Sequence, residues 1–257
     1  MPSAVEKAEP GAKRVLALMV SDTLAIAQKH LAPATTAPMQ AKLENWFQQG
    51  LKHYYGKEVP QNYPEATNWF CKAAEQGHAE AQYYLGLCYG YGHGAPQDYT
   101  EAVKWYREAA EQGHAEAQLS LAIWYQRGRG VPQDYAQAVK WYREAAEQGH
   151  AGAQYYLGTC YSLGQGVQLD DSEAAKWFRE AAEQGDAEAQ FCLGWCYYDG
   201  GGVPQDHVEA YKWFKLAAEM CHSEASDKLE SLSSKMTQEQ IAEGERRYTE
   251  FEASHQT

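Results

Sequence analysis

No stretch of the 257-residue sequence is apolar over the length that a membrane helix requires. Such a helix needs about 20 consecutive apolar residues, whereas the apolar segment at residues 15–20 is followed at once by Ser21 and Asp22. Residues 13–27 look like a secretory signal, but their apolar segment is shorter than the roughly 7–15 residues of such signals. We therefore predict no membrane span. We interpret residues 13–31 as an amphipathic helix and residues 32–38 as a linker, both within an N-terminal extension over 1–40.

A surplus of basic residues is also absent. The chain has 22 Lys and Arg against 35 Asp and Glu, which gives a net charge of −13. Because nucleic-acid binding needs clustered Lys and Arg, this balance excludes a nucleic-acid partner. The basic residues alternate with glutamate, and we expect Lys104 and Glu108, or Arg107 and Glu111, to pair across one helical turn on a solvated face.

The motifs of common catalytic and metal sites are missing as well. The sequence contains no Ser-x-x-Lys, and its glycine-rich segments do not follow a strand pattern as a phosphate loop does. Cys192 and Cys196 would share a helix face, but no second pair of ligands completes a zinc site. We expect them to be buried as small apolar residues. The sequence predicts no catalytic residue, no metal and no cofactor.

What the chain has instead is a repeat of 36 residues. The segment EAVKWYREAAEQG (101–113) recurs as QAVKWYREAAEQG (137–149) and EAAKWFREAAEQG (173–185). A fixed period of this size indicates a solenoid, in which each unit buries its apolar face against its neighbours. Five tryptophans follow the period: Trp69, Trp105, Trp141, Trp177 and Trp213. The predicted array covers residues 42–229, with units at 42–77, 78–113, 114–149, 150–185 and 186–221 and a partial unit at 222–229.

Each unit has the pattern of two helices joined by a turn. Aspartates after the turn are suited to cap the second helix, and Gly113 is suited to end it. A small residue such as Gly86 inside the first helix indicates close helix–helix approach, and we expect the tryptophan to fill the space between the paired helices. The capping aspartates are Asp98, Asp134, Asp170 and Asp206.

Histidine recurs at the start of the first helix, where one unit has Asp186 instead. A position that accepts either residue is that of a helix cap or a hinge contact rather than a metal ligand. The histidines concerned are His78, His114, His150 and His222.

The pattern A-x-A-Q-x-x-L-G-x-x-Y, then G-x-G-V-P-Q-D, then A-x-x-W-Y-x-x-A-A-E-Q-G resembles the Sel-one-like repeat, a relative of the tetratricopeptide repeat. The resemblance covers residues 65–229 and, more loosely, 42–64. It implies an all-α, right-handed α/α superhelical solenoid of 36-residue helix-turn-helix repeats. Some secreted members carry two cysteines per repeat that form a disulfide. That pairing is absent here, which favours a reducing compartment.

In tetratricopeptide-like arrays the first helix of each unit lines a concave surface, so the resemblance assigns a groove by register. The positions in this groove vary between units, whereas Ala81, Leu85 and their equivalents barely change. Many of them are aromatic or apolar, as in binding surfaces. Tyr83 and Phe191 fit inter-unit packing equally well, and we expect exposure at Trp195, Tyr198 and Arg127. The predicted groove residues are Glu80, Tyr83, Leu87, Gly90, Tyr91, Glu116, Leu119, Ile123, Gln126, Arg127, Gly152, Tyr155, Thr159, Ser162, Leu163, Glu188, Phe191, Trp195, Tyr198 and Asp199.

These features predict a cytoplasmic bacterial adaptor that binds a peptide segment or a partner protein, with its acidic groove residues selecting Lys or Arg. One alternative is an exported protein, periplasmic or secreted, that neutralises a toxin or engages a host factor. A more remote alternative, implied by family members linked to β-lactams, is a β-lactam or cell-wall hydrolase. Thr237 starts a capping-box pattern within residues 230–257. That segment fits a capping helix or a dimerisation helix, and the oligomeric state stays open.

Overall fold

The computed structural model describes residues 36–255, and this part of the chain is all helical, without strands. The amphipathic helix expected over 13–31, the signal-like segment 13–27 and residues 32–35 of the predicted linker 32–38 lie outside the described residues. The end of that linker was wrong, because Ala37 and Pro38 already belong to a helix. The first described helix begins at Ala37, five residues before the start predicted for the first unit. The helices are α2 (Ala37–Tyr55), α3 (Tyr63–Ala74), α4 (Ala79–Tyr91), α5 (Tyr99–Glu111), α6 (Ala115–Arg127), α7 (Tyr135–Glu147), α8 (Ala151–Leu163), α9 (Asp171–Glu183), α10 (Ala187–Asp199), α11 (His207–Glu219), α12 (Ala225–Ser233) and α13 (Gln238–His255).

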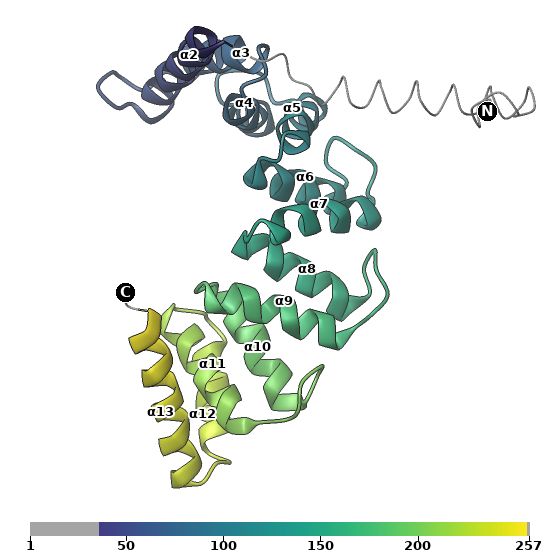
Figure 1. The fold of residues 1–257 in the computed structure, drawn as a ribbon, viewed down its shortest axis with the longest axis vertical. Helices are drawn as coiled ribbons and strands as arrows, with labels where there is room; N and C mark the ends of the chain where they lie inside the picture. Colours follow the sequence, from purple (N-terminus) through teal and green to yellow (C-terminus); the bar gives the residue numbers. More distant parts are fainter. Residues whose placement is uncertain (1–35, 256–257) are drawn as a thin grey trace, which may run out of the picture.

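The helices form successive antiparallel pairs that stack into one array. Each first helix (α2, α4, α6, α8 or α10) packs against the second helix of its own unit, and each second helix packs against the first helix of the next. The array bends into an arc whose two ends, α2 and α13, lie on the same side (Figure 1). This arrangement confirms the prediction of an all-α solenoid built from helix-turn-helix repeats.

The helix ends follow the capping residues that the sequence predicted. Asp98 and its equivalents accept hydrogen bonds from backbone N–H groups at the start of each second helix. His78, His114 and His150 do the same for the first helices through Nδ1, and Asp186 does so through a carboxylate oxygen. The recurring histidine slot is therefore a helix cap, and its exchange with aspartate keeps the cap intact.

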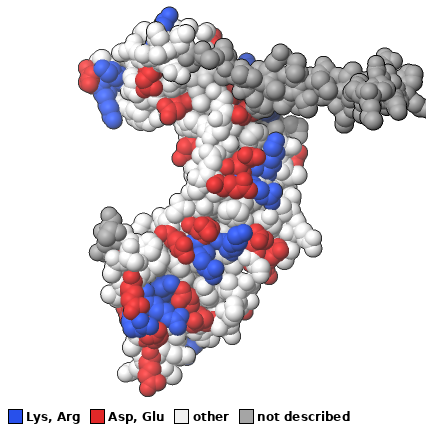
Figure 2. All heavy atoms as spheres, viewed as in Figure 1, with Lys and Arg blue, Asp and Glu red and all other residues white. Residues whose placement is uncertain are grey.

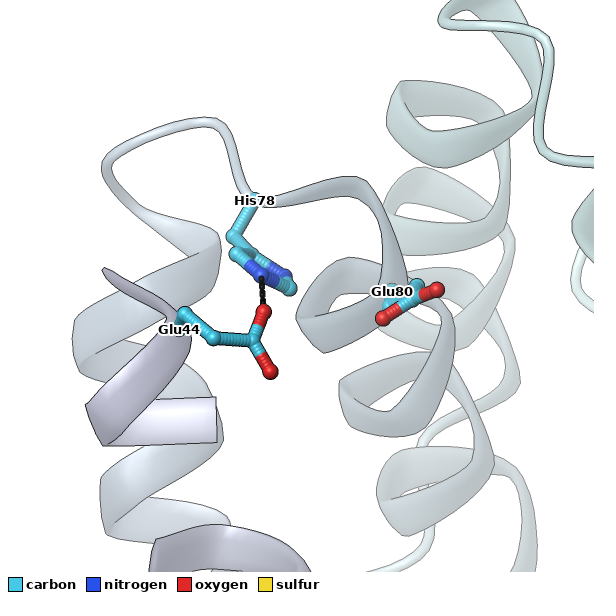
Figure 3. A group of neighbouring side chains, drawn as sticks. All are labelled: Glu44, His78 and Glu80. Atoms are coloured by element: carbon cyan, nitrogen blue, oxygen red, sulfur yellow. Dashed lines mark hydrogen bonds and ion pairs between the residues drawn. The ribbon is translucent and has the colours of Figure 1, made fainter. Parts of the chain in front are cut away.

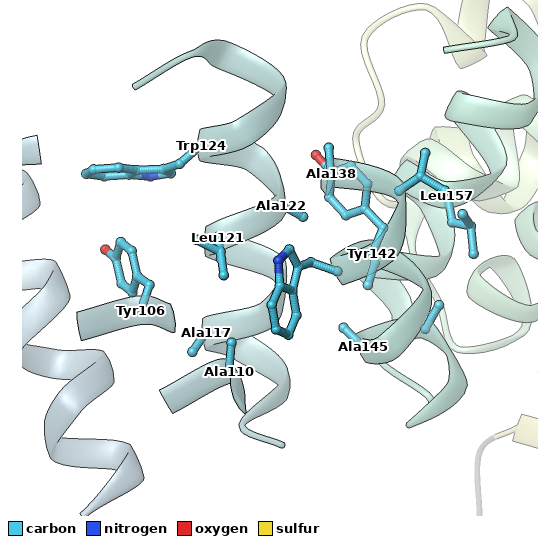
Figure 4. Packing of buried hydrophobic residues seen from close by; sticks show 14 of the residues in the cluster. Tyr106, Ala110, Ala117, Leu121, Ala122, Trp124, Ala138, Tyr142, Ala145 and Leu157 are labelled. Atoms are coloured by element: carbon cyan, nitrogen blue, oxygen red, sulfur yellow. The ribbon is translucent and has the colours of Figure 1, made fainter. Parts of the chain in front are cut away.

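An aromatic ring fills the space between the two helices of each unit, but it is not the tryptophan that the sequence favoured. A Cβ on Gly86 would lie 2.6 Å from a ring carbon of Tyr106, and Phe178 and Phe214 occupy the same place against Gly158 and Gly194. Tyr106 is 1% exposed, and it lies beside Trp124 of the next unit (Figure 4). The residue after each repeated tryptophan therefore forms the centre of the unit.

The repeated tryptophans lie at the edge of this core. Trp69, Trp105 and Trp177 are half-buried, while Trp141 and Trp213 are buried. Each ring has a lysine ammonium over it, as Lys104 stands 5.2 Å from the centroid of Trp105. One face of the indole thus covers the core and the other meets a cation. The expectation that the tryptophan fills the space within the helix pair was wrong, because its Cα lies one position, or about 100°, around the helix from the inward-facing ring.

The arginines of the second helices connect neighbouring units, which the sequence analysis missed. Arg107 donates a hydrogen bond to the hydroxyl of Tyr125 at 2.7 Å, and Arg143 and Arg179 do the same to Tyr161 and Tyr197. The predicted pairing of Arg107 with Glu111 on a solvated face is replaced by this contact with the next unit.

The last unit is covered by α12 and α13, which both pack against α11. Thr237 and Gln240 exchange the two hydrogen bonds of a capping box at the start of α13. Arg247 of α13 forms ion pairs with Asp206, the N-cap of α11, and with Glu209 within α11, both at 3.0 Å. Together these contacts cover the apolar side of α11, which carries the buried Trp213 and Leu216.

Candidate functional site

The last residue of each first helix is exposed, and these residues make a row that we call the terminal row. The first two members are both tyrosine, and each later member has a different chemistry. The row consists of Tyr55, Tyr91, Arg127, Leu163 and Asp199. Tyr91 is 65% exposed, Leu163 58% and Tyr55 52%. Exposed apolar side chains of this size can form a binding surface, and Tyr99, Leu169 and Met220 are exposed outside the row. Tyr55 was not among the predicted groove residues, although its distance of 36 residues from Tyr91 would have identified it.

Earlier in the first helices stand four half-buried residues that we call the central row: Tyr83, Leu119, Tyr155 and Phe191. Tyr83 stacks on the capping His114 of the next unit with ring centroids 5.0 Å apart, and Phe191 stacks on His222 at 4.2 Å. Burial raises the pKa of Tyr155 to about 12. These residues take part in inter-unit packing and leave only part of each side chain exposed.

The remaining central positions are also held by internal contacts. Leu87 and Ile123 pack on the hydrophobic core, and Thr159 donates its hydroxyl to the carbonyl of Tyr155. Gln126 accepts a hydrogen bond from the buried Tyr142 at 2.6 Å. Gly90 is buried against Trp124.

The C-terminal end of the predicted groove is covered, contrary to the expectation of exposure at Trp195 and Tyr198. Both side chains are half-buried. The ammonium of Lys228, on α12, lies 3.6 Å from the ring centroid of Trp195 and 4.9 Å from that of Tyr198. The predicted partial unit at 222–229 contains Lys228, but the sequence pattern did not show that this side chain would lie over the two rings. Arg127 and Asp199 are exposed, as expected for Arg127.

The exposed glutamates at the other end of the first helices form pairs with the capping histidines. Glu116 lies 3.0 Å from His150, Glu188 lies 3.3 Å from His222, and Glu44 lies 3.3 Å from His78 (Figure 3). Glu80 acts electrostatically on His114, whose pKa is lowered mainly by burial. In the one remaining unit Gly152 replaces the glutamate and Asp186 replaces the histidine. The glutamates thus join adjacent units as well as facing solvent.

The trio Glu44, His78 and Glu80 brings three ligand-type atoms within 4.8 Å of one another (Figure 3). The Nδ1 of His78 accepts a hydrogen bond from the Ala81 N–H at 3.2 Å, so in the neutral ring Nε2 carries the hydrogen and points it at Glu44. A neutral imidazole whose Nδ1 accepts a hydrogen bond and whose Nε2 donates one has no lone pair left for a cation. The geometry of this trio is that of a helix cap whose second ring nitrogen is hydrogen-bonded to Glu44.

Four thiols of the first helices are held away from solvent: Cys88 and Cys160 are buried, and Cys192 and Cys196 are half-buried. Burial raises the pKa of Cys192 to about 12 and that of Cys196 to about 11. Burial likewise raises the pKa of Cys88 and Cys160 to about 11. These side chains act as small apolar residues.

The surface as a whole carries both signs of charge. Figure 2 shows basic and acidic side chains close together in bands over the array, without an extended basic area on the face in view. Within residues 36–255, no helix is both long and apolar enough to cross a membrane.

The comparisons with known proteins agree with this architecture. The model of the Sel1 repeat matches residues 50–78, 79–114, 115–150, 151–186 and 187–220. A search of the curated proteins gives no match. The chain is similar to the solved structure of a Sel1 repeat protein from Oxalobacter formigenes, with 38% identity, a TM-score of 0.67 and coverage of 79% of this chain and 83% of that one.

It is also similar to a protective antigen present in uropathogenic Escherichia coli strains, described as displaying an SLR fold. The identity is 38% and the TM-score 0.73, over 82% of this chain and 46% of that chain, so this chain spans less than half the length of the antigen. The repeat model, the helix pairs and these two structures together place the chain in the Sel1 repeat family.

Proposed function

We propose that this array is a scaffold that binds an extended segment of a partner protein along its first helices. Sel1 repeat proteins are generally protein-interaction scaffolds. The observation that carries the proposal is the terminal row: at one register position the chain places five exposed residues of nearly all different chemistry. Residues with a purely structural role in a repeat keep their identity, as Ala81 and Leu85 do. The residues of the terminal row differ from unit to unit, so packing does not fix their identity and they can select a ligand.

The chemistry of the surface favours a segment with basic and apolar side chains. The net charge is −13, and Glu80, Glu116 and Glu188 are exposed at one end of the first helices. Tyr55 and Tyr91 offer aromatic anchors at the N-terminal part of the row. Electrostatic complementarity of this kind mainly speeds association and selects the partner, while the aromatic anchors supply most of the affinity. We place this adaptor in the cytoplasm.

Selection from a displayed library of random peptides tests the proposal. We expect enrichment of Lys or Arg together with aromatic or branched side chains. For a selected peptide, Tyr91→Ala and Leu163→Ala each weaken binding about tenfold, which corresponds to about 1.4 kcal/mol. Leu169→Ala is the matched control, because Leu169 is 57% exposed but lies outside the terminal row. Equal loss in the control, or no enrichment, contradicts the proposal.

A second candidate is an exported protein that engages a host factor or neutralises a toxin. It is supported by the 38% identity to the protective antigen and by the signal-like pattern of residues 13–27. Mass spectrometry of the N-terminus in cell extracts separates the two. Cleavage near Gln28 supports export, and an intact Met1 or Pro2 supports the cytoplasmic adaptor.

A further inference from the structure

A ladder of buried glutamines runs through the array. Gln82, Gln118 and Gln154 each donate Nε2 to a carbonyl at the end of the preceding second helix, at 3.1–3.2 Å. The Oε1 of each accepts a hydrogen bond from a glutamine 30 residues later, at 2.6–2.7 Å. These donors are Gln112, Gln148 and Gln184. Both ends of each buried amide are therefore satisfied within the protein.

The ladder is broken in the last unit. Gln190 is 3% exposed and donates to the carbonyl of Ala182 at 3.2 Å. Its Oε1 is one of the few buried side-chain atoms in residues 36–255 that have no hydrogen-bond partner. The residue 30 positions later is Met220, which is 60% exposed and whose side chain has no N–H to donate. A buried acceptor without a donor lowers the stability of the folded protein, so a ligand N–H that bonds to it gains free energy.

Gln190 is one of the residues that line a cleft between the ends of α9, α11 and α13. The cleft has a volume of about 420 Å³ and is lined by Gln190 together with Glu183, Glu219 and the apolar Leu216 and Phe251. That volume falls within the roughly 300–1,000 Å³ of small-ligand sites. The carboxylates of Glu183 and Glu219 and the unpaired Oε1 of Gln190 give the cleft an excess of acceptors, and His255 also lines it. The cleft is thus complementary to a cation with several N–H donors.

We propose that this cleft binds an arginine side chain of a partner protein. A guanidinium has five N–H donors in a planar fork, so it can bond Gln190 Oε1 and a rim carboxylate at once. It is also less strongly hydrated than an ammonium, which suits a partly buried site, and its methylene stem can lie on Leu216 and Phe251. The cleft lies apart from the terminal row and does not depend on the function proposed for that row.

Titration of the full-length protein with N-acetyl-L-arginine amide, followed by NMR at the side-chain amide of Gln190, tests this site. We expect saturable shifts of the Gln190 resonances and binding at least fivefold tighter than that of N-acetyl-L-lysine amide. Met220→Gln rebuilds the ladder, because residue 220 then donates to Gln190 as Gln184 does to Gln154. This variant weakens arginine binding at least tenfold and raises Tm by a few degrees.

Two matched variants, each of which removes one carboxylate, test whether the arginine binds in this cleft. Glu183→Gln weakens binding severalfold, whereas Glu147→Gln, at the equivalent position one unit earlier, leaves it unchanged. Tyr91→Ala also leaves it unchanged, which separates this site from the terminal row. The absence of shifts at Gln190, unchanged binding by Met220→Gln, or equal binding of the lysine probe overturns the proposal.

Discussion

At the scale of the residue, Cys221 stands at a position that is glycine in the four preceding units. Gly77, Gly113, Gly149 and Gly185 follow the second helices with φ of 86–87°, and Cys221 takes φ of 61° at the same place. This left-handed backbone costs an L-residue about 1–2 kcal/mol, and glycine adopts it readily.

We therefore expect Cys221→Gly to raise the free energy of unfolding by about 1 kcal/mol, measured by urea denaturation. Gly149→Ala is the reverse control. A Cβ at Gly149 meets no atom within 4 Å, so any loss of stability there is due to the backbone conformation alone. If Cys221→Gly is neutral while Gly149→Ala destabilises, the backbone at position 221 carries no strain that glycine relieves.

His114 is a histidine whose pKa is shifted in the folded protein. Burial lowers its pKa, against the opposing effects of Glu80 and Glu116. A histidine whose folded pKa lies below its unfolded value of about 6.5 contributes stability above that pH, and the contribution is lost as pH falls toward the folded pKa. We expect His114→Asn, which keeps a capping acceptor, to reduce the slope of stability against pH between pH 7 and 5. An unchanged slope would show that His114 titrates equally in the folded and unfolded chain.

At the scale of the element, adjacent first helices are joined by the Glu–His pairs, and one joint lacks both partners. Gly152 and Asp186 stand where the other joints have glutamate and histidine. Glutamate opposite Asp186 would set two carboxylates against each other, and burial already raises the pKa of Asp186. The two replacements are therefore complementary.

A double-mutant cycle at this joint tests that interpretation. We expect Gly152→Glu to destabilise the protein when Asp186 is present. In the Asp186→His background the same change should be neutral or stabilising, with a coupling of about 0.5–1 kcal/mol in denaturant melts at pH 6. Additive effects of the two substitutions would mean that these positions do not interact.

Much of each element could be predicted from the sequence, because the period places caps and turns at every repeat. Asp98 was predicted to be a cap and His78 a cap or a hinge contact, and both accept backbone hydrogen bonds. Side-chain direction was harder. The sequence shows that Trp105 and Tyr106 both recur, but which of two adjacent residues points inward depends on the rotation of the helix. The cover over Trp195 was missed because it depends on Lys228, in a helix that lies beyond the clear repeats.

At the scale of the whole molecule, the array consists of nearly interchangeable interfaces. Helices α5 and α7 differ at only two of their 13 positions, Thr100 against Ala136 and Glu101 against Gln137. The surface that α7 presents to α8 is therefore almost the surface that α5 presents to α6. In a solenoid whose stability is a sum of units and nearest-neighbour interfaces, an inner unit can be removed without breaking the stack.

Deletion of residues 115–150 tests this interchangeability. It joins His114 to Ala151, so that His114 caps α8 as His150 does in the full chain, and Arg107 meets Tyr161 in place of Arg143. We expect a folded, cooperative protein with unchanged helicity per residue by circular dichroism and a lower Tm, since one unit and one interface are lost. Deletion of residues 115–134 is the control. It removes α6 but keeps α7, which places two second helices in succession, and it should give an unfolded or aggregated chain. If both deletions fold equally well, the stack is not held together by the register of its first and second helices.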